Sequence, residues 1–169
     1  MKYLFIIIPV VALIVLIGVI WWNQVLPYRI SKDYRAPEDT VSYVSYTRSG
    51  DMNGSQLNMS LRRISDSQAL LSCSYRKAAN KSRRDYSRRV SADVLDQITE
   101  AIREHGMSEW LDLPKKDVFV LDEASQTLRY RINSTNYVIS SISRMPDEGK
   151  GFGKIRAILL QLATMTFKL

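Results

Sequence analysis

The chain begins with a long apolar run. Residues 3–22 contain no charged side chain, and the run ends at Trp21 and Trp22. A helix of this length spans about 30 Å, which is the thickness of a bilayer hydrocarbon core. Paired tryptophans are typical of the membrane interface. The run exceeds the apolar core of a cleaved signal peptide and is followed by no A-x-A-like cleavage site. We therefore predict a transmembrane signal-anchor at residues 1–26 that contacts the lipid bilayer through residues 3–22.

A polar stretch separates this run from the rest of the chain. Residues 27–40 contain Pro27 and Pro37 and few apolar side chains, which predicts a partly extended juxtamembrane linker. Residues 41–169 are enough to bury about two-thirds of their unfolded surface around one core. We therefore expect a single globular domain over residues 41–169.

Apolar and polar residues alternate with a period of two along much of this domain. The alternating stretches are 41–47, 57–61, 71–75, 128–132 and 137–143. Turn-forming residues separate neighbouring stretches, including Asn53-Gly54 and the segment 133–136. Strands with one apolar face are typical of an antiparallel sheet, so the pattern predicts a sheet of about five strands.

Helical spacing replaces this alternation in two places. Leu95, Ile98 and Ile102 form one stripe, with Ser91 as the expected N-cap and Gly106 just after the end, which predicts a helix over 92–105. Residues 107–113 form an apolar connector that is expected to plug the core. A glycine-rich loop is expected at 146–153, and a second helix follows with its apolar side formed by Ile155, Ile158, Leu159 and Leu162.

The expected order is thus β-β-β-α-β-β-α. This order predicts an α+β domain in which two helices cover one face of an antiparallel sheet, preceded by one transmembrane helix.

The order of motifs after residue 95 is similar to that of a known family. The first predicted helix ends at Gly106 and leads into Trp110, and Leu121-Asp122 precedes a strand over 125–132. Pro146 and Phe152 come before the closing helix. This order resembles an uncharacterised family of small membrane-anchored or lipoprotein-like domains of Gram-positive bacteria, which has no assigned function.

The resemblance also bears on localisation. Lys2 precedes the apolar run, and Arg29, Lys32 and Arg35 follow it, which favours a cytoplasmic carboxyl side. The resemblance implies an extracytoplasmic domain instead, and we give it more weight. We therefore expect a single-pass cell-membrane protein whose globular domain lies outside the cytoplasm.

Cysteine and histidine are too scarce for several kinds of chemistry. Cys73 and His105 are the only residues of their types, which excludes an intramolecular disulfide and a cysteine-based zinc site. Gly149 to Ile155 lacks the spacing and the hydroxyl of a phosphate-binding loop. No metal, cofactor or catalytic constellation is therefore expected. The alternative is an envelope-associated hydrolase that uses the loop carboxylates Asp51, Asp117 and Asp122.

The charge of the chain is concentrated in one segment. The formal net charge is +7, and residues 76–89 carry a cluster of cations against a single carboxylate. The candidate polyanion-binding residues are Arg76, Lys77, Lys81, Arg83, Arg84, Arg88 and Arg89. Such a cluster attracts anionic lipid headgroups or wall polymers. Nucleic acid is disfavoured, because the domain is expected outside the cell and one interleaved tyrosine is a poor stacking platform. The alternative is a solvated hairpin extension.

These features together predict the class of protein. We expect a membrane-anchored cell-envelope module with a non-enzymatic binding or structural role near the membrane surface.

Overall fold

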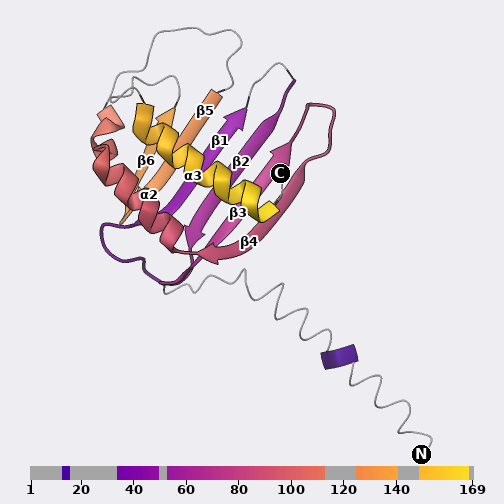
Figure 1. Ribbon diagram of the computed structural model, residues 1–169, viewed down its shortest axis with the longest axis horizontal. Coiled ribbons are helices and arrows are strands. Elements are labelled where there is room, and N and C mark those ends of the chain that lie inside the picture. Colours follow the sequence, from indigo (N-terminus) through magenta and orange to yellow (C-terminus); the bar gives the residue numbers. More distant parts are fainter. Residues whose placement is uncertain (1–12, 16–33, 50–52, 113–124, 141–148, 168–169) are drawn as a thin grey trace, which may run out of the picture. The chain divides into compact units, whose positions relative to one another are not determined.

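The computed structural model describes residues 13–15, 34–49, 53–112, 125–140 and 149–167. Contacts within the chain divide it into two units, Met1–Tyr34 and Arg35–Leu169. The second unit contains six strands, two α-helices and one 3₁₀ helix among its described residues (Figure 1). In chain order they are β1 (Val41–Ser49), β2 (Gln56–Arg63), β3 (Gln68–Arg76), β4 (Arg84–Ser91), α2 (Asp93–Glu104), η2 (Met107–Asp112), β5 (Ser125–Ile132), β6 (Thr135–Ser140) and α3 (Lys150–Phe167).

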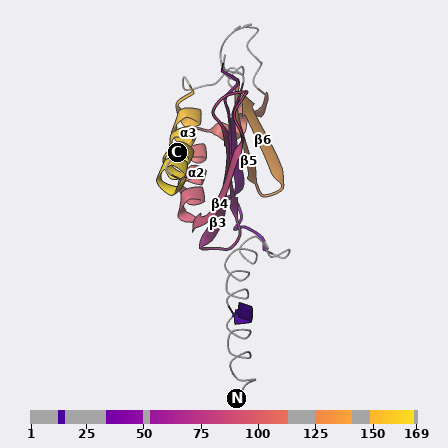
Figure 2. The same cartoon turned by 90° about the vertical axis from the view of Figure 1, so that its right-hand side faces the viewer.

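The strands form one antiparallel sheet in the order β4-β3-β2-β1-β5-β6. Both α2 and α3 lie on the same face of this sheet (Figure 2). The predicted α+β architecture, with helices on one face of an antiparallel sheet, is therefore confirmed. The sheet brings β1 beside β5, so the N-terminal meander continues directly into the second hairpin.

The expected strand count was wrong, because residues 84–91 form β4. Tyr86 and Val90 are the only apolar residues of this strand and both are half-buried, so its apolar alternation is weak. The strand lies at the edge of the sheet. Charged side chains at an edge oppose pairing with a strand of another chain. Because most of its residues are charged or polar, this strand does not show the apolar alternation from which strands are predicted.

The core lies between the helices and the inward face of the sheet. Its fully buried large side chains are Tyr46, Met59, Leu61, Leu71, Leu95, Ile98, Ile102, Met107, Leu128, Tyr130, Ile155 and Leu159. Tyr130 stacks on Tyr137 with ring centroids 4.8 Å apart, and its hydroxyl donates a hydrogen bond of 3.0 Å to the Met107 carbonyl. Burial raises the pKa of Tyr130. Met107 and Trp110 of η2 are both buried, as expected for the connector, whereas its residue Leu113 lies outside the described residues.

The helix ends differ in detail from the expectation. Ala92, not Ser91, is the N-cap of α2, although the Ser91 hydroxyl still accepts a hydrogen bond of 3.3 Å from the Asp93 N–H. Gly106 follows the helix with a φ of 57°, as predicted for its C-terminal glycine. Helix α3 already begins at Lys150. The end of the expected loop at 146–153 is therefore the first turn of a helix.

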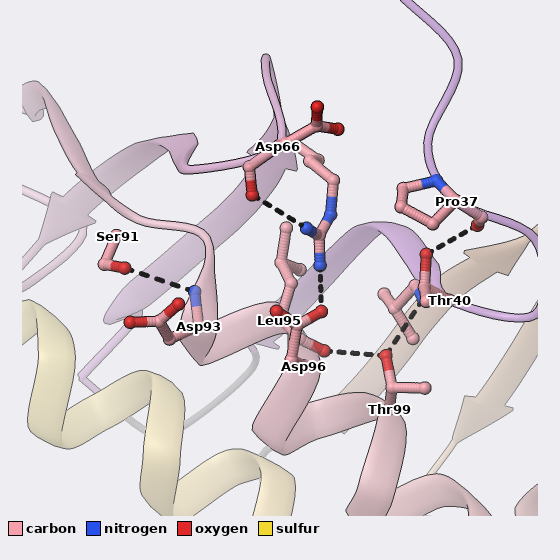
Figure 3. Close-up of polar contacts among 10 residues, drawn as sticks. Pro37, Thr40, Asp66, Ser91, Asp93, Leu95, Asp96 and Thr99 are labelled. Carbon is pink, nitrogen blue, oxygen red and sulfur yellow. Dashed lines mark hydrogen bonds and ion pairs between the residues drawn. The ribbon is translucent and has the colours of Figure 1, made fainter.

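A buried arginine ties the start of α2 to the β2–β3 turn. The Arg63 side chain is 3% exposed. It donates hydrogen bonds to the Asp66 carbonyl at 3.3 Å and to the Asp96 carboxylate, with which it also forms an ion pair (Figure 3). Thr99 adds a second link, because its hydroxyl donates to the Leu95 carbonyl at 2.7 Å and accepts from the Val41 N–H at 3.0 Å. The helix is thus held against both β1 and β2 by polar contacts.

The predicted signal-anchor lies almost wholly outside the described residues. Leu13, Ile14 and Val15 are helical, and each is exposed. Within the described part of the chain, no helix combines the length and the apolar character needed to cross a membrane. Trp21, Trp22 and linker residues before Tyr34 are also outside the described residues. The anchor and its interface therefore stay predictions.

Candidate binding surfaces on the sheet

The predicted polyanion-binding residues all belong to the β3–β4 hairpin. Arg76 ends β3, and the connecting loop carries Lys77, Lys81 and Arg83. Strand β4 carries Arg84, Arg88 and Arg89. We call this segment, residues 76–89, the basic hairpin. The structure thus gathers the cations on one supersecondary element at the edge of the sheet.

The cations of β4 point to opposite faces of the sheet. Arg84 and Arg88 pair with Tyr75 and Leu71 of β3, which places them on the helix side. Arg89 pairs with Leu70 and lies on the opposite side, where it donates a hydrogen bond of 3.2 Å to the Gln68 side chain. The basic hairpin therefore presents positive charge in more than one direction.

One cation of the hairpin is occupied by an acidic neighbour. The Arg83 guanidinium lies 2.9 Å from the Asp85 carboxylate, and both side chains are exposed. Hydrogen bonds from Arg83, and then from Ser74, hold the pKa of the Asp85 carboxyl below its ordinary value. Asp85 is therefore ionised at neutral pH and neutralises part of the charge of the hairpin.

The loop of the basic hairpin packs against the β1–β2 turn. The Ala79 N–H donates a hydrogen bond of 2.9 Å to the Asn53 carbonyl. Gly54 has a φ of 65°, and a Cβ there would lie 2.8 Å from that of Ala79, so the close approach requires glycine. Between these loops lies a hollow of about 480 Å³ that is lined by Asn53, Lys77, Ala78, Ala79, Asn80 and Lys81. Two cations thus share one hollow.

The sheet face opposite the helices carries rows of small hydroxyl side chains. We call it the open face, because no helix of the described chain covers it (Figure 2). Four serines lie directly opposite one another on neighbouring strands, namely Ser87, Ser72, Ser60 and Ser45. The hydroxyls of Ser72 and Ser87 are 3.1 Å apart and hydrogen-bonded. We call these four residues the serine row.

Neighbouring rows on the open face differ in charge. On one side of the serine row the cross-strand partners are Asp85, Ser74, Asn58, Thr47 and Thr127. On the other side they are Arg89, Leu70, Arg62, Tyr43 and Arg131, which we call the arginine row. Arg129 is the partner of Ser45 and extends the serine row onto β5. Among the described residues, no carboxylate pairs with Arg62, Arg129 or Arg131.

The small side chains leave a shallow depression of about 450 Å³ in the open face. Its lining includes the serine row together with Tyr43, Thr47, Asn58, Ser74, Arg83, Asp85 and Arg129. Ser45 lies at its floor and is 7% exposed, whereas Arg129 of the same lining is exposed. We call this depression the trough.

The trough and the arginines of the open face were not predicted from the sequence. Arg62, Arg129 and Arg131 are scattered along the chain and belong to no charge run. The available signal was that the outward positions of several strands are serine, asparagine or arginine. Only the strand order and register bring these residues onto one face, where Arg62 and Arg131 flank Tyr43 of β1.

The residues considered for catalysis are mostly outside the described part. Asp51, Asp117 and Asp122 are not among the described residues. Cys73 is buried, and burial raises the pKa of its thiol. His105 is the C-cap residue of α2. Within the ranges that the structure describes, no group of histidine, cysteine, aspartate and glutamate side chains could hold a metal ion.

Comparison with known proteins found neither a matching family model nor a matching curated protein. What the basic hairpin and the trough bind is therefore inferred from their geometry and charge.

Proposed function

We propose that this chain is a single-pass, membrane-anchored module of the bacterial cell envelope that binds anionic polymers and catalyses no reaction. The apolar run at 3–22 would serve as the anchor, and the linker at 27–40 would keep the domain close to the membrane. The resemblance to membrane-anchored Gram-positive domains supports an extracytoplasmic location. Anionic polymers are abundant partners for a basic domain in that place.

The observation that carries the proposal is the basic hairpin. Its cations are Arg76, Lys77, Lys81, Arg83, Arg84, Arg88 and Arg89, and Asp85 is its only carboxylate. Lys77, Lys81, Arg84, Arg88 and Arg89 are all exposed. A concentrated positive field of this kind raises the local concentration of a polyanion and speeds its association.

The distribution of these cations favours a polymer over a bilayer surface. Lys77 and Lys81 line the loop hollow, whereas Arg84 and Arg89 lie on opposite faces of β4. A planar layer of headgroups can contact one side of this hairpin at a time. A flexible polymer that crosses the sheet can bend around the edge at β4 and reach cations on both faces.

Binding of linear polyphosphate by the full chain tests the proposal. The protein is embedded in nanodiscs of zwitterionic lipid, and binding is followed by the anisotropy of labelled polyphosphate. We expect an affinity that falls by tens of fold between 50 and 200 mM salt, on the order expected for about four released counterions. A variant with Lys77→Gln, Lys81→Gln, Arg84→Gln and Arg88→Gln should bind at least tenfold more weakly.

A second variant controls for net charge alone. Arg35→Gln, Arg103→Gln, Lys150→Gln and Lys154→Gln remove the same charge elsewhere on the domain and should leave most of the affinity. Equal losses in the two variants, or binding that ignores salt, would contradict the proposal. Binding to phosphatidylglycerol vesicles without binding to polyphosphate would assign the hairpin to lipid headgroups instead.

A further inference from the structure

We infer that the trough on the open face is the seat of the polymer and that it selects a linear, hydroxyl-rich anionic chain, such as an acidic polysaccharide. The inference rests on the proposed function and names the ligand class for it. It is carried by residues outside the basic hairpin as well as by Ser87 and Arg89 within it.

Hydrogen-bonding groups are aligned across the strands of the open face. The serine row places one hydroxyl on each of four neighbouring strands, and Arg129 continues it onto a fifth. Because strands are about 4.8 Å apart, the row from Ser87 to Arg129 extends over roughly 19 Å. A serine hydroxyl has one donor and two acceptor lone pairs, and Ser72 and Ser87 use part of theirs on each other. A chain lying across the strands would therefore meet a hydrogen-bonding group at every strand.

The shape of the open face favours a narrow ligand. The parallel row that contains Asn58 and Ser74 lies about 6.6 Å away along the strands, since two residues separate the rows. Both rows consist mainly of short side chains, so the space above them forms the trough of about 450 Å³. Arg83 and Arg129 are the arginines of its lining, and Tyr43 is the residue of the arginine row that reaches it. The open face thus carries a shallow depression across the strands and is not a flat plane.

The charge of the open face favours an anionic ligand. Arg62, Arg89, Arg129 and Arg131 are exposed on the open face. Among the described strand positions of that face, Asp85 is the only carboxylate, and Arg83 already pairs with it. A guanidinium offers several donors in a planar fork that matches carboxylate and phosphate groups. Arg131 donates one hydrogen bond to the Asn136 amide oxygen and Arg89 one to the Gln68 side chain, so each guanidinium keeps further donors. An anionic group on the polymer would therefore find donors at Arg129 in the trough and at the arginines on the same face.

Other occupants fit this face less well. A second copy of the chain would bring two arginine rows together, and like charges repel. A partner with an apolar surface would desolvate the serine hydroxyls without giving them hydrogen bonds. A bilayer surface would reach the exposed arginines but not Ser45 at the floor. A narrow chain that carries both hydroxyls and anionic groups can hydrogen-bond to the serines at the floor of the trough and pair with the arginines beside them.

Two polymers of equal length that differ in their hydroxyls test the inference. Polygalacturonate and poly-L-glutamate both carry carboxylates, but only the first carries ring hydroxyls. With the full chain in zwitterionic nanodiscs at one salt concentration, we expect at least fivefold tighter binding of polygalacturonate. Ser60→Ala together with Ser72→Ala should remove this preference and leave poly-L-glutamate binding within twofold.

The arginines are tested separately. Arg62→Gln, Arg129→Gln and Arg131→Gln in one variant should weaken both polymers at least tenfold. Ser67→Ala with Ser108→Ala removes two exposed hydroxyls outside the trough and serves as the matched control, with no change expected. Circular dichroism and the thermal midpoint confirm that each variant is folded.

The outcomes separate this inference from the proposed function. Equal wild-type affinity for the two polymers, or a preference that survives in the serine variant, overturns the assignment of the trough. If those polymers still bind in a salt-dependent way that requires the basic hairpin, the proposed function stands without it. If the wild-type chain binds neither polymer nor polyphosphate, both proposals fail.

Discussion

Asp39 and Asn133 exchange two hydrogen bonds although 94 residues separate them in the sequence. The Asp39 N–H donates to the Asn133 amide oxygen at 3.1 Å, and the Asn133 amide nitrogen donates to the Asp39 carboxylate at 3.0 Å. Both residues have a positive φ, of 55° and 52°. The pair thus links the segment before β1 to the turn between β5 and β6.

Two substitutions at Asn133 separate the hydrogen bonds from the backbone conformation. Asn133→Gly loses the side-chain bonds but adopts a positive φ freely, so we expect a loss of about 1 kcal/mol in the free energy of unfolding. Asn133→Ala also pays for the left-handed conformation and should lose about 2 kcal/mol. Urea unfolding followed by circular dichroism measures both. An alanine variant as stable as the glycine variant would refute the role of the positive φ.

Gly151 allows the close approach of α3 to the end of α2. A Cβ at this position would lie 2.8 Å from the Cβ of His105 and 2.9 Å from the sulfur of Met107. Gly151→Ala should therefore lower the free energy of unfolding by about 1–3 kcal/mol through overpacking. Gly153 lies in the same helix with no atom within 4 Å of such a Cβ. Gly153→Ala should raise stability by about 0.5–1 kcal/mol, because alanine favours helix. The reverse order of thermal midpoints would contradict this packing.

Arg63 is buried whereas its ion-pair partner Asp96 is half exposed, so we expect the two residues to differ in how much stability their replacement costs. Asp96→Ala leaves a buried guanidinium with only the Asp66 carbonyl, and we expect a loss of about 2 kcal/mol, moderated because Asp96 is half exposed. Arg63→Met removes the buried charge as well and should cost about 1 kcal/mol. Gln97→Ala, on an exposed site of α2, should stay within about 0.5 kcal/mol. Chemical denaturation ranks the three variants, and a costlier Arg63→Met would disprove the explanation.

Cys73 should be unreactive in the folded protein. Its thiol is 2% exposed, and burial, followed by the negative charge of Asp85, raises its pKa above the ordinary value. The thiolate is the reactive form, so less of it is present at pH 8 than in an exposed cysteine. Reaction with an aromatic disulfide reagent should be at least a hundredfold faster in 8 M urea than in buffer. A fast reaction in buffer would show that the helices do not seal this part of the sheet.

Hydrophobic periodicity predicted most elements, because burial of one face leaves a mark on nearly every strand and helix. Strands β1, β2, β3, β5 and β6 and helix α2 appear at or near their expected positions. The two misses share a cause. Strand β4 lies at an edge and has little apolar surface to bury, and the start of α3 is glycine-rich because Gly151 packs against His105 and Met107. Tertiary context overrides local propensity at both places.

The two parts of the candidate site also differ in whether the sequence predicts them. The basic hairpin was visible in the sequence, because its cations are neighbours along the chain. The trough was not, because Ser45, Ser60, Ser72 and Ser87 become neighbours only when strands pair.

The sequence by itself determined the class of domain, its core-facing residues and the concentration of charge, since each depends on the order of residues along a short stretch; the anchor at residues 1–26 stays a prediction. Only the tertiary structure decided that β1 pairs with both β2 and β5 and in which register. A shift of one residue would turn every side chain of a strand to the other face. The serine row and the arginine row exist because the buried face sets that register, and the outward side chains align as its consequence.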